Sequence, residues 1–243
     1  MRSLFRSRPL PLLLSALVVP LLFAGCGGGS ANGGAVTVTQ NFDFDAGMQG
    51  WTSDVSDLPA DYNNDNYQIS YSVAALPAPL NTAKKALRLT SFNQSDDLWQ
   101  FVKRQVTGLR ANTRYNVRFD VEIASDAPEN SVGIGGSPGS SVIVKGGAAI
   151  AEPAVRIENG ARVFTLDKGN NSQQGTQARN LGNVGIPGDE SVYKLKQLNN
   201  VSRLLPLTTD SSGNAWVFVG ADSGYEGQKE LYYTQIKLTF TPR

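Results

Sequence analysis

The chain has 243 residues, of which 22 are basic and 21 acidic, and its formal net charge is +1. Without a surplus or a stripe of basic residues, it is not typical of a nucleic-acid-binding protein. It contains no histidine and one cysteine, so an enzyme would have to use Asp, Glu, Lys or Tyr, and we expect neither a disulfide nor a cysteine metal site.

Residues 1–25 predict a lipoprotein signal peptide. Three arginines precede an apolar run at 9–23 that contains three prolines. The run is shorter than the ~20 residues of a membrane span, so it favours an export signal over a permanent transmembrane helix. It ends in FAGC, which resembles a bacterial lipobox. We therefore expect cleavage before Cys26, and acylation there would hold the protein on the bacterial cell envelope. In a Gram-negative bacterium this would be the outer membrane or the cell surface. The alternative is an ordinary signal peptide with an incidental cysteine.

The rest of the chain predicts a tether followed by one domain. GGGSANGG follows the cysteine and is typical of a flexible linker. We expect residues 26–38 to form the lipidated tether and residues 39–243 to form the domain, because neither a second linker nor an internal repeat occurs. Roughly 205 residues are enough for one substantial core.

Ten segments show the composition and rhythm of β-strands. They are rich in Val, Ile, Thr, Tyr and Phe and are separated by Gly, Asn, Asp or Pro. In chain order they are 35–44, 67–73, 86–92, 98–106, 114–123, 141–145, 161–166, 192–198, 215–220 and 231–240. In 114–123 apolar and polar residues alternate strictly, which predicts one buried and one solvated face. The pattern indicates an all-β fold with a single antiparallel β-sandwich.

Long loops occupy the irregular middle of the chain, from 133 to 188, and such loops commonly carry binding function. One of them, Gly135–Gly139, matches the G-x-S-x-G nucleophile elbow of α/β-hydrolases letter for letter. The elbow needs a backbone N–H after the serine, and Pro138 has none. With no histidine to act as a base, we interpret this segment as a structural turn.

Acidic residues cluster between the first two strand segments, at Asp54, Asp57, Asp61 and Asp65. Their carboxylates would suit Ca²⁺, but the glycine and the terminal glutamate of an EF-hand loop are missing. We therefore favour a solvated turn in which Asp and Asn bond to their own backbone.

Two groups of acids beside an aromatic residue form the candidate ligand site. The candidate residues are Asp96, Asp97, Trp99, Asp222, Tyr225 and Glu226. Aromatic rings can stack on sugar C–H faces while carboxylates accept hydrogen bonds from hydroxyls, and paired carboxylates also serve glycosidases. A structural turn or strand edge is the simpler interpretation of both groups. Trp51, Trp99 and Trp216 are each more typical of a sandwich core than of a binding platform.

Three segments resemble galactose-binding-like jelly rolls and carbohydrate-binding modules. These are NFDFDAGMQGW at 41–51, GLRANTRYNVRFDV at 108–121 and LYYTQIKLTF at 231–240. The whole chain also resembles a set of uncharacterised bacterial lipoproteins that share SDDLWQFVK, GIGGSPGSSV and VGADSGYEG. The first resemblance implies a jelly-roll sandwich and a carbohydrate ligand.

The same resemblance implies a structural Ca²⁺ in some members, held by an acid of the first strand and an aspartate of the closing strand. Asp43 or Asp45 could be the first of these, but Thr234 stands where the second would be. We therefore expect no metal and no other cofactor.

Three hypotheses follow. The first is a lipid-anchored envelope lipoprotein whose non-catalytic domain binds a carbohydrate or another glycan. The second is a glycoside hydrolase that uses two of the four candidate acids, with their carboxyl groups about 5–10 Å apart in one cleft. The third is a structural or assembly lipoprotein that binds a partner protein of the envelope.

Overall fold

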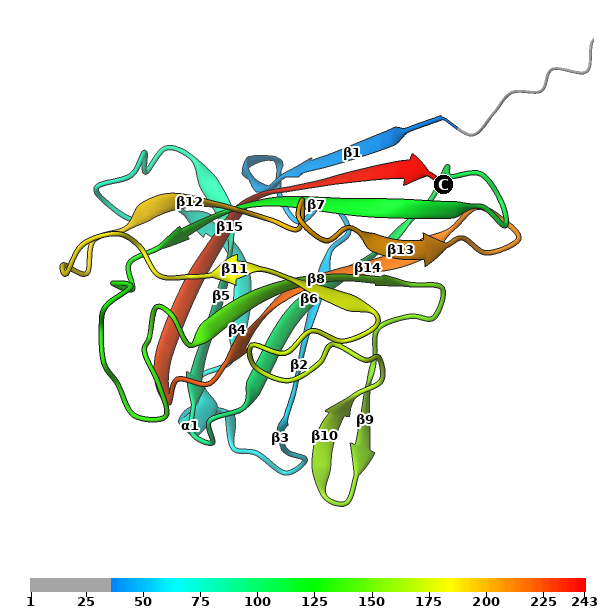
Figure 1. Cartoon of the computed structure of the whole chain (residues 1–243). Helices are drawn as coiled ribbons and strands as arrows, with labels where there is room; N and C mark the ends of the chain where they lie inside the picture. Colours follow the sequence, from blue (N-terminus) through cyan, green and yellow to red (C-terminus); the bar gives the residue numbers. More distant parts are fainter. Residues whose placement is uncertain (1–35) are drawn as a thin grey trace, which may run out of the picture. The chain divides into compact units, whose positions relative to one another are not determined.

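Two antiparallel β-sheets pack face to face in the computed structural model, which describes residues 36–243 (Figure 1). Contacts between Cα atoms group Ala35–Arg243 into one compact unit. The expected signal peptide, Cys26 and most of the tether lie outside the described residues. No described helix is long and apolar enough to cross a bilayer. The expectation of an all-β antiparallel sandwich is confirmed.

The first sheet has seven strands in the order β12-β7-β15-β5-β4, with β1 also paired to β15 and β13 to β7. Its strands are β1 (Val38–Asp43), β4 (Ser70–Ala75), β5 (Lys85–Asn93), β7 (Arg114–Ser125), β12 (Lys194–Asn199), β13 (Leu205–Thr208) and β15 (Gly227–Pro242). The closing strand β15 is long enough to pair with β5 along its first half and with β1 along its second half.

The second sheet has five strands in the order β11-β8-β14-β6-β2. Its strands are β2 (Thr52–Ser56), β6 (Leu98–Val106), β8 (Val142–Ala149), β11 (Ala178–Asn183) and β14 (Ala215–Ser223). A small third sheet joins β3 (Leu58–Pro59), β10 (Ala161–Phe164) and β9 (Val155–Glu158). Two short helices, η1 (Phe44–Ala46) and α1 (Asn64–Tyr67), lie in the connections. From β5 to β8 each strand lies in the sheet opposite to that of the strand before it, as in a jelly roll.

The main core lies between the two large sheets and follows the alternation seen in the sequence. All five apolar residues of β7 that were expected to face inward are at most 1% exposed: Tyr115, Val117, Phe119, Val121 and Ile123. They belong to one cluster with inward-facing residues of β8 and β14. Burial of this apolar surface supplies most of the stability that a domain without disulfides requires.

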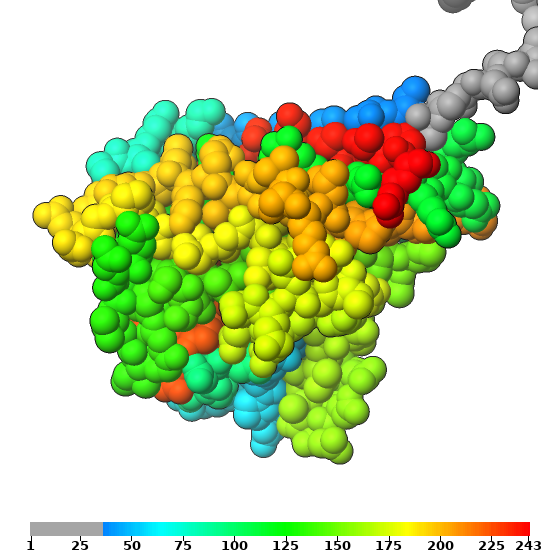
Figure 2. Space-filling model, in the orientation of Figure 1, coloured from blue at the N-terminus to red at the C-terminus, as the bar shows by residue number. Residues whose placement is uncertain are grey.

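The outer face of the second sheet is also buried, because the β9–β10 hairpin and the segment 165–177 cover it. A second aromatic cluster lies there, with Trp99, Phe101 and Phe218 from the sheet packed against Phe164 of the β9–β10 hairpin. The segment 165–177, which connects β10 to β11, continues this cover across the sheet (Figures 1 and 2). This second buried layer explains why AWVFVG in β14 is apolar on both faces.

Candidate functional site

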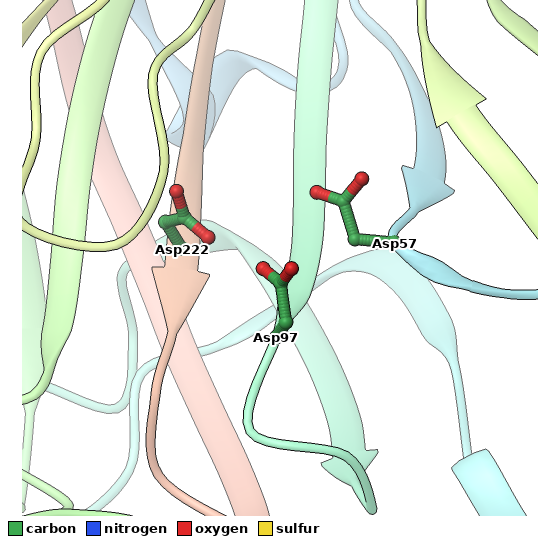
Figure 3. Close-up of side chains that lie close together, drawn as sticks. All are labelled: Asp57, Asp97 and Asp222. Atoms are coloured by element: carbon green, nitrogen blue, oxygen red, sulfur yellow. The ribbon is translucent and has the colours of Figure 1, made fainter.

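Three aspartates meet on the covered face of the second sheet, where neighbouring strands end. Asp222 lies near the end of β14, Asp97 precedes β6 and Asp57 follows β2. The register of the sheet places both Asp222 and Ser56 opposite Trp99, which brings these strand ends side by side. One carboxylate oxygen from each aspartate lies within 4.8 Å of the others, and the three carboxylates converge (Figure 3).

Backbone turns hold two of these aspartates in place. Asp57 has a φ of 65° and the neighbouring Asp96 a φ of 61°. Both are in the left-handed region, which Asp tolerates better than most residues. These turns end β2 and begin β6, so that Asp57 and Asp97 both project toward Asp222.

Lys145 of β8 is fully buried beside the aspartates. Its ammonium lies 2.8 Å from Asp222 Oδ2, and it donates to the backbone oxygens of Lys168 at 3.2 Å and Gln173 at 3.0 Å. Burial lowers the pKa of Lys145, and the charge of Asp222 opposes this shift. Three acceptors satisfy the three N–H groups of this ammonium.

Lys168 comes from the covering segment and is the second buried cation. Its ammonium lies 3.0 Å from Asp57 Oδ2 and 3.1 Å from Asp222 Oδ2, and it donates to the oxygen of Gly169 at 3.2 Å. It also lies 5.5 Å from the centre of the Trp99 ring, a cation–π distance. Burial would lower its pKa, but the charges of Asp222 and Asp57 outweigh burial and raise it.

Two aspartates and two lysines are therefore held together by ion pairs, whereas Asp97 takes part in none. A third buried cation, Lys229, acts on Asp222 through its charge without forming an ion pair. Asp97 has no hydrogen bond or ion pair with any described residue, and its Oδ1 is buried without a partner. Burial raises its pKa to about 6, and the negative charge of Asp57 adds to the shift. Burial of a carboxylate oxygen without a hydrogen-bond donor costs folding free energy. A ligand that donates to Asp97 would recover this cost, so Asp97 is the carboxylate of this cluster that remains available to a ligand.

Asp97 and Asp57 open onto a cavity of about 250 Å³. Its other lining residues are Val163, Phe164, Leu166, Asp167, Lys168, Gly169 and Asn170. A second cavity of about 360 Å³ is lined by Asp96, Gly135, Ser140, Ser141, Ile143, Asn171, Ser172 and Gly224. Consecutive residues line the two cavities, Asp96 beside Asp97 and Asn171 beside Asn170, so the cavities are neighbours.

The structure brings together three of the six candidate ligand residues, namely Asp97, Trp99 and Asp222. Trp99 is fully buried and stacks on Phe101 with ring centres 5.9 Å apart. It contacts the Lys168 ammonium rather than the cavity, so it packs beneath the site. Asp222 is also fully buried and lies beneath the cavity rather than on its wall. Only Asp97 of these three lines the cavity.

The other three candidates lie elsewhere. Asp96 is exposed and lines the second cavity, and Glu226 lies close by, since a Cβ added to Gly135 would be 2.6 Å from Asp96 Oδ1 and 3.2 Å from Glu226 Cγ. Tyr225 lines a separate cavity of about 300 Å³ next to Lys229.

Sequence reasoning did not identify Asp57, Lys145 or Lys168 as site residues. Asp57 was interpreted as part of a solvated turn, but it is the ion-pair partner of Lys168. A detectable signal existed for Lys145, which ends the apolar run SVIVK, and for Asp222, which follows AWVFVGA. Opposite charges inside two otherwise buried strands predict that they pair with each other.

Asp43 and Asp45 lie at the end of β1, away from this cluster. Asp43 Oδ1 accepts a hydrogen bond from the backbone N–H of Asp45, and Asp45 Oδ1 accepts one from the N–H of Lys85 at 2.9 Å. Thr234 donates to Glu122. Among residues 36–243, the only acidic group close enough to hold a metal is Asp57, Asp97 and Asp222.

That group fits a metal ion poorly. A divalent cation would need the oxygens of Asp57 and Asp222 that the Lys168 ammonium already contacts at 3.0 and 3.1 Å. Lys145 adds a second positive charge at 2.8 Å from Asp222. The ammonium groups thus occupy the place of a cation, and a metal would have to displace one of them against repulsion from the other.

Comparisons with known proteins find only distant similarities to solved structures. No protein-family model and no curated protein matches it. Among solved structures, a carbohydrate-binding module of the β-sandwich superfamily is 10% identical with a TM-score of 0.40, over 80% of this chain and 59% of that one. A module that recognises mannan is 10% identical with a TM-score of 0.40, over 84% and 98%. The family 11 module of a Clostridium thermocellum cellulase is 12% identical with a TM-score of 0.38, over 86% and 97%.

Proposed function

We propose that the domain is a non-catalytic saccharide-binding module that binds its ligand in the cavity at Asp97. The observation that carries this proposal is the carboxylate of Asp97, which has no partner of its own and opens onto a concave surface. Binding sites of small ligands typically combine an apolar wall with a few polar groups of fixed position.

The cavity offers both kinds of surface that a sugar requires. Its wall includes the side chains of Phe164 and Leu166, against which the C–H face of a sugar ring can pack. Asp97 supplies acceptors for hydroxyl groups, and Asn170 supplies a donor and an acceptor. The second cavity, lined by Asp96 and several serines, provides room for the next residue of an oligosaccharide.

Lipid attachment at Cys26 is the second part of the proposal, and it rests on the sequence FAGC and the glycine tether. Two or more acyl chains hold a protein stably on a membrane, since each buried CH₂ contributes about 0.8 kcal/mol. The domain would then be displayed on the bacterial cell envelope. Mass spectrometry of the membrane fraction should show a diacylglyceryl-modified Cys26, and Cys26→Ser should abolish both the modification and the membrane association.

The hydrolase alternative receives less support from the geometry. A glycosidase places two carboxyl groups on opposite sides of a glycosidic bond. Of the four acids in this hypothesis, Asp222 is fully buried and paired with two lysines, so it is not free to act on a bound sugar. Asp97 lines the first cavity, whereas Asp96 lines the second and lies near Glu226. If the protein released reducing ends from the saccharides tested below, the domain would be a glycoside hydrolase and not a non-catalytic module. Capture of an envelope protein in place of a glycan would favour the assembly hypothesis.

Isothermal titration against a panel of oligosaccharides tests the binding proposal. The informative variant is Asp97→Leu, which removes the acceptor but keeps the side chain's approximate size. We expect it to lose at least about tenfold in affinity, equivalent to about 1.4 kcal/mol. Asp189→Leu is the matched control, because Asp189 is exposed and lines neither cavity. Equal affinity of Asp97→Leu and the original protein would overturn the placement of the site, and no binding to any saccharide would overturn the function.

A further inference from the structure

We infer that the saccharide bound at Asp97 carries a protonated amine, as in an oligosaccharide of glucosamine with free amino groups. This inference rests on the proposed function and narrows its ligand class. It follows from the balance of charges around the two cavities and from the partners that each charge already has.

The first step asks which charged groups of the cluster already have an ion-pair partner and which have none. Lys145 and Lys168 neutralise Asp57 and Asp222, and each ammonium has three acceptors. Asp97 has no hydrogen bond or ion pair with any described residue, because the ammonium groups of Lys145 and Lys168 are held by Asp57 and Asp222.

The second step is the surplus of acid on the rim. Asp167 lines the same cavity, and hydrogen bonds from the N–H and hydroxyl of Thr176 and the N–H of Gly169 lower its pKa, which keeps it ionised. Asp96 adds a further carboxylate in the neighbouring cavity. Asp96, Asp97 and Asp167 therefore bring three carboxylates to the two cavities, whereas the chain as a whole is nearly neutral.

The third step is an orphaned oxygen inside the cluster. Asp222 is fully buried and its carboxylate points toward Asp57 and Asp97 (Figure 3). Its Oδ1 has no hydrogen-bond partner among the described residues, like Oδ1 of Asp97. Asp57 Oδ2 also lacks a hydrogen-bond donor, although it lies 3.0 Å from the Lys168 ammonium. The cluster therefore keeps carboxylate charge that no described donor covers, and this charge favours a ligand that brings several N–H groups and a positive charge to Asp97, the only one of these three aspartates besides Asp57 that lines the cavity. An ammonium has three such donors, and charge-assisted hydrogen bonds are roughly twice as strong as neutral ones.

A metal ion is the other cation that such a surplus could attract. It would have to coordinate through the oxygens of Asp57 and Asp222 that Lys168 holds, as described above. An ammonium that approaches from the cavity needs only Asp97 and leaves the buried lysines in place.

The experiment compares three ligands that differ in charge. Isothermal titration of the purified protein is carried out with oligosaccharides of glucosamine, with their N-acetylated counterparts and with neutral mannose oligosaccharides. We expect the first to bind most tightly. Asp97→Asn removes the charge but keeps an acceptor, and it should weaken that binding by about 10- to 100-fold, as for loss of a charged hydrogen bond of about 1.5–3 kcal/mol. Asp189→Asn removes an exposed charge outside both cavities and should leave it unchanged.

The pH dependence of binding is a second measurement, made on the original protein and on Asp97→Asn under the same conditions so that the titration of the ligand's own amine cancels. Below about pH 6, protonation of Asp97 should reduce the affinity of the original protein relative to that of the variant, and the difference between the two should shrink. The charged groups that act on Asp97 are Asp57, Asp222, Lys145 and Lys168.

The outcomes separate this inference from the proposed function. If N-acetylated or neutral saccharides bind as tightly as the amine form and Asp97→Asn binds normally, the amine inference is wrong and the saccharide-binding function stands. If no saccharide binds, both are wrong. Calcium binding that depends on Asp97 would also overturn the inference, since it would identify the missing cation as a metal.

Discussion

Removal of the buried cation Lys145 provides a direct test of the charge network. Lys145→Met keeps most of the side-chain volume but leaves Asp222 fully buried with Lys168 as its one remaining counter-ion. Breaking a buried ion pair from one side costs about 3–5 kcal/mol when the remaining charge is left uncompensated, and because Lys168 still contacts Asp222 we expect about 3 kcal/mol, the lower end of that range. For a domain of this size, that corresponds to a fall in melting temperature of about 10 °C.

Urea unfolding followed by tryptophan fluorescence measures this loss. The control is Arg156→Met, which breaks an ion pair of similar length, 2.7 Å to Glu158, between side chains that are 59% and 48% exposed. Such surface pairs contribute about 0–1 kcal/mol. A loss at Lys145 no larger than the loss at Arg156 would refute the claim that Asp222 needs its buried partner.

Three further predictions concern stability. Asp97→Asn should raise the free energy of unfolding at about pH 7 by about 1 kcal/mol, because burial disfavours the ionised carboxylate of Asp97. This gain should vanish at about pH 4, where the carboxyl is protonated in the folded protein and the penalty is gone. A gain that persists at about pH 4 would contradict this explanation. Lys229 is buried without a hydrogen-bond partner and burial lowers its pKa to about 8, so Lys229→Met should stabilise the fold at about pH 7. That advantage should shrink as the pH rises through about 8 toward 10, and a difference independent of pH would argue against it. Gly147→Ala should destabilise by about 1–3 kcal/mol, because its Cβ would lie 2.0 Å from Phe218 Cζ, whereas Gly224→Ala, with its nearest atom at 3.4 Å, should cost less.

The fold could be predicted because its signals are local. The alternation in 114–123 records directly which side chains face the core, and the structure buries the expected five. The second buried layer was less accessible to sequence reasoning, since a strand covered on both faces shows no alternation. The apolar run AWVFVG therefore indicated a strand, but not the cover above it.

The charge network could not be derived from the sequence because it depends on register. Asp57 directly follows β2, Lys145 lies on β8 and Asp222 on β14, and they meet through three strand pairings: β2 with β6, β6 with β14, and β14 with β8. A shift of one residue in any of these pairings would send a side chain to the opposite face. Proximity in the chain identified Asp97 and Asp222 as candidates, but not which neighbours would neutralise them.

Lys168 has a consequence for the order in which the domain forms. Its ion-pair partners are Asp57, which follows β2, and Asp222 on β14, far apart in the chain. The segment 165–177 therefore has its counter-ions in place only after both strands have joined the second sheet. We expect contacts of such long sequence separation, made by a segment that covers an already formed sheet, to be absent from the folding transition state. Substitution of Lys168 should therefore accelerate unfolding while leaving the refolding rate almost unchanged, and stopped-flow kinetics can measure both. The cavity lined by Asp57, Asp97 and Lys168 would then be the last part of the domain to assemble and the first to open.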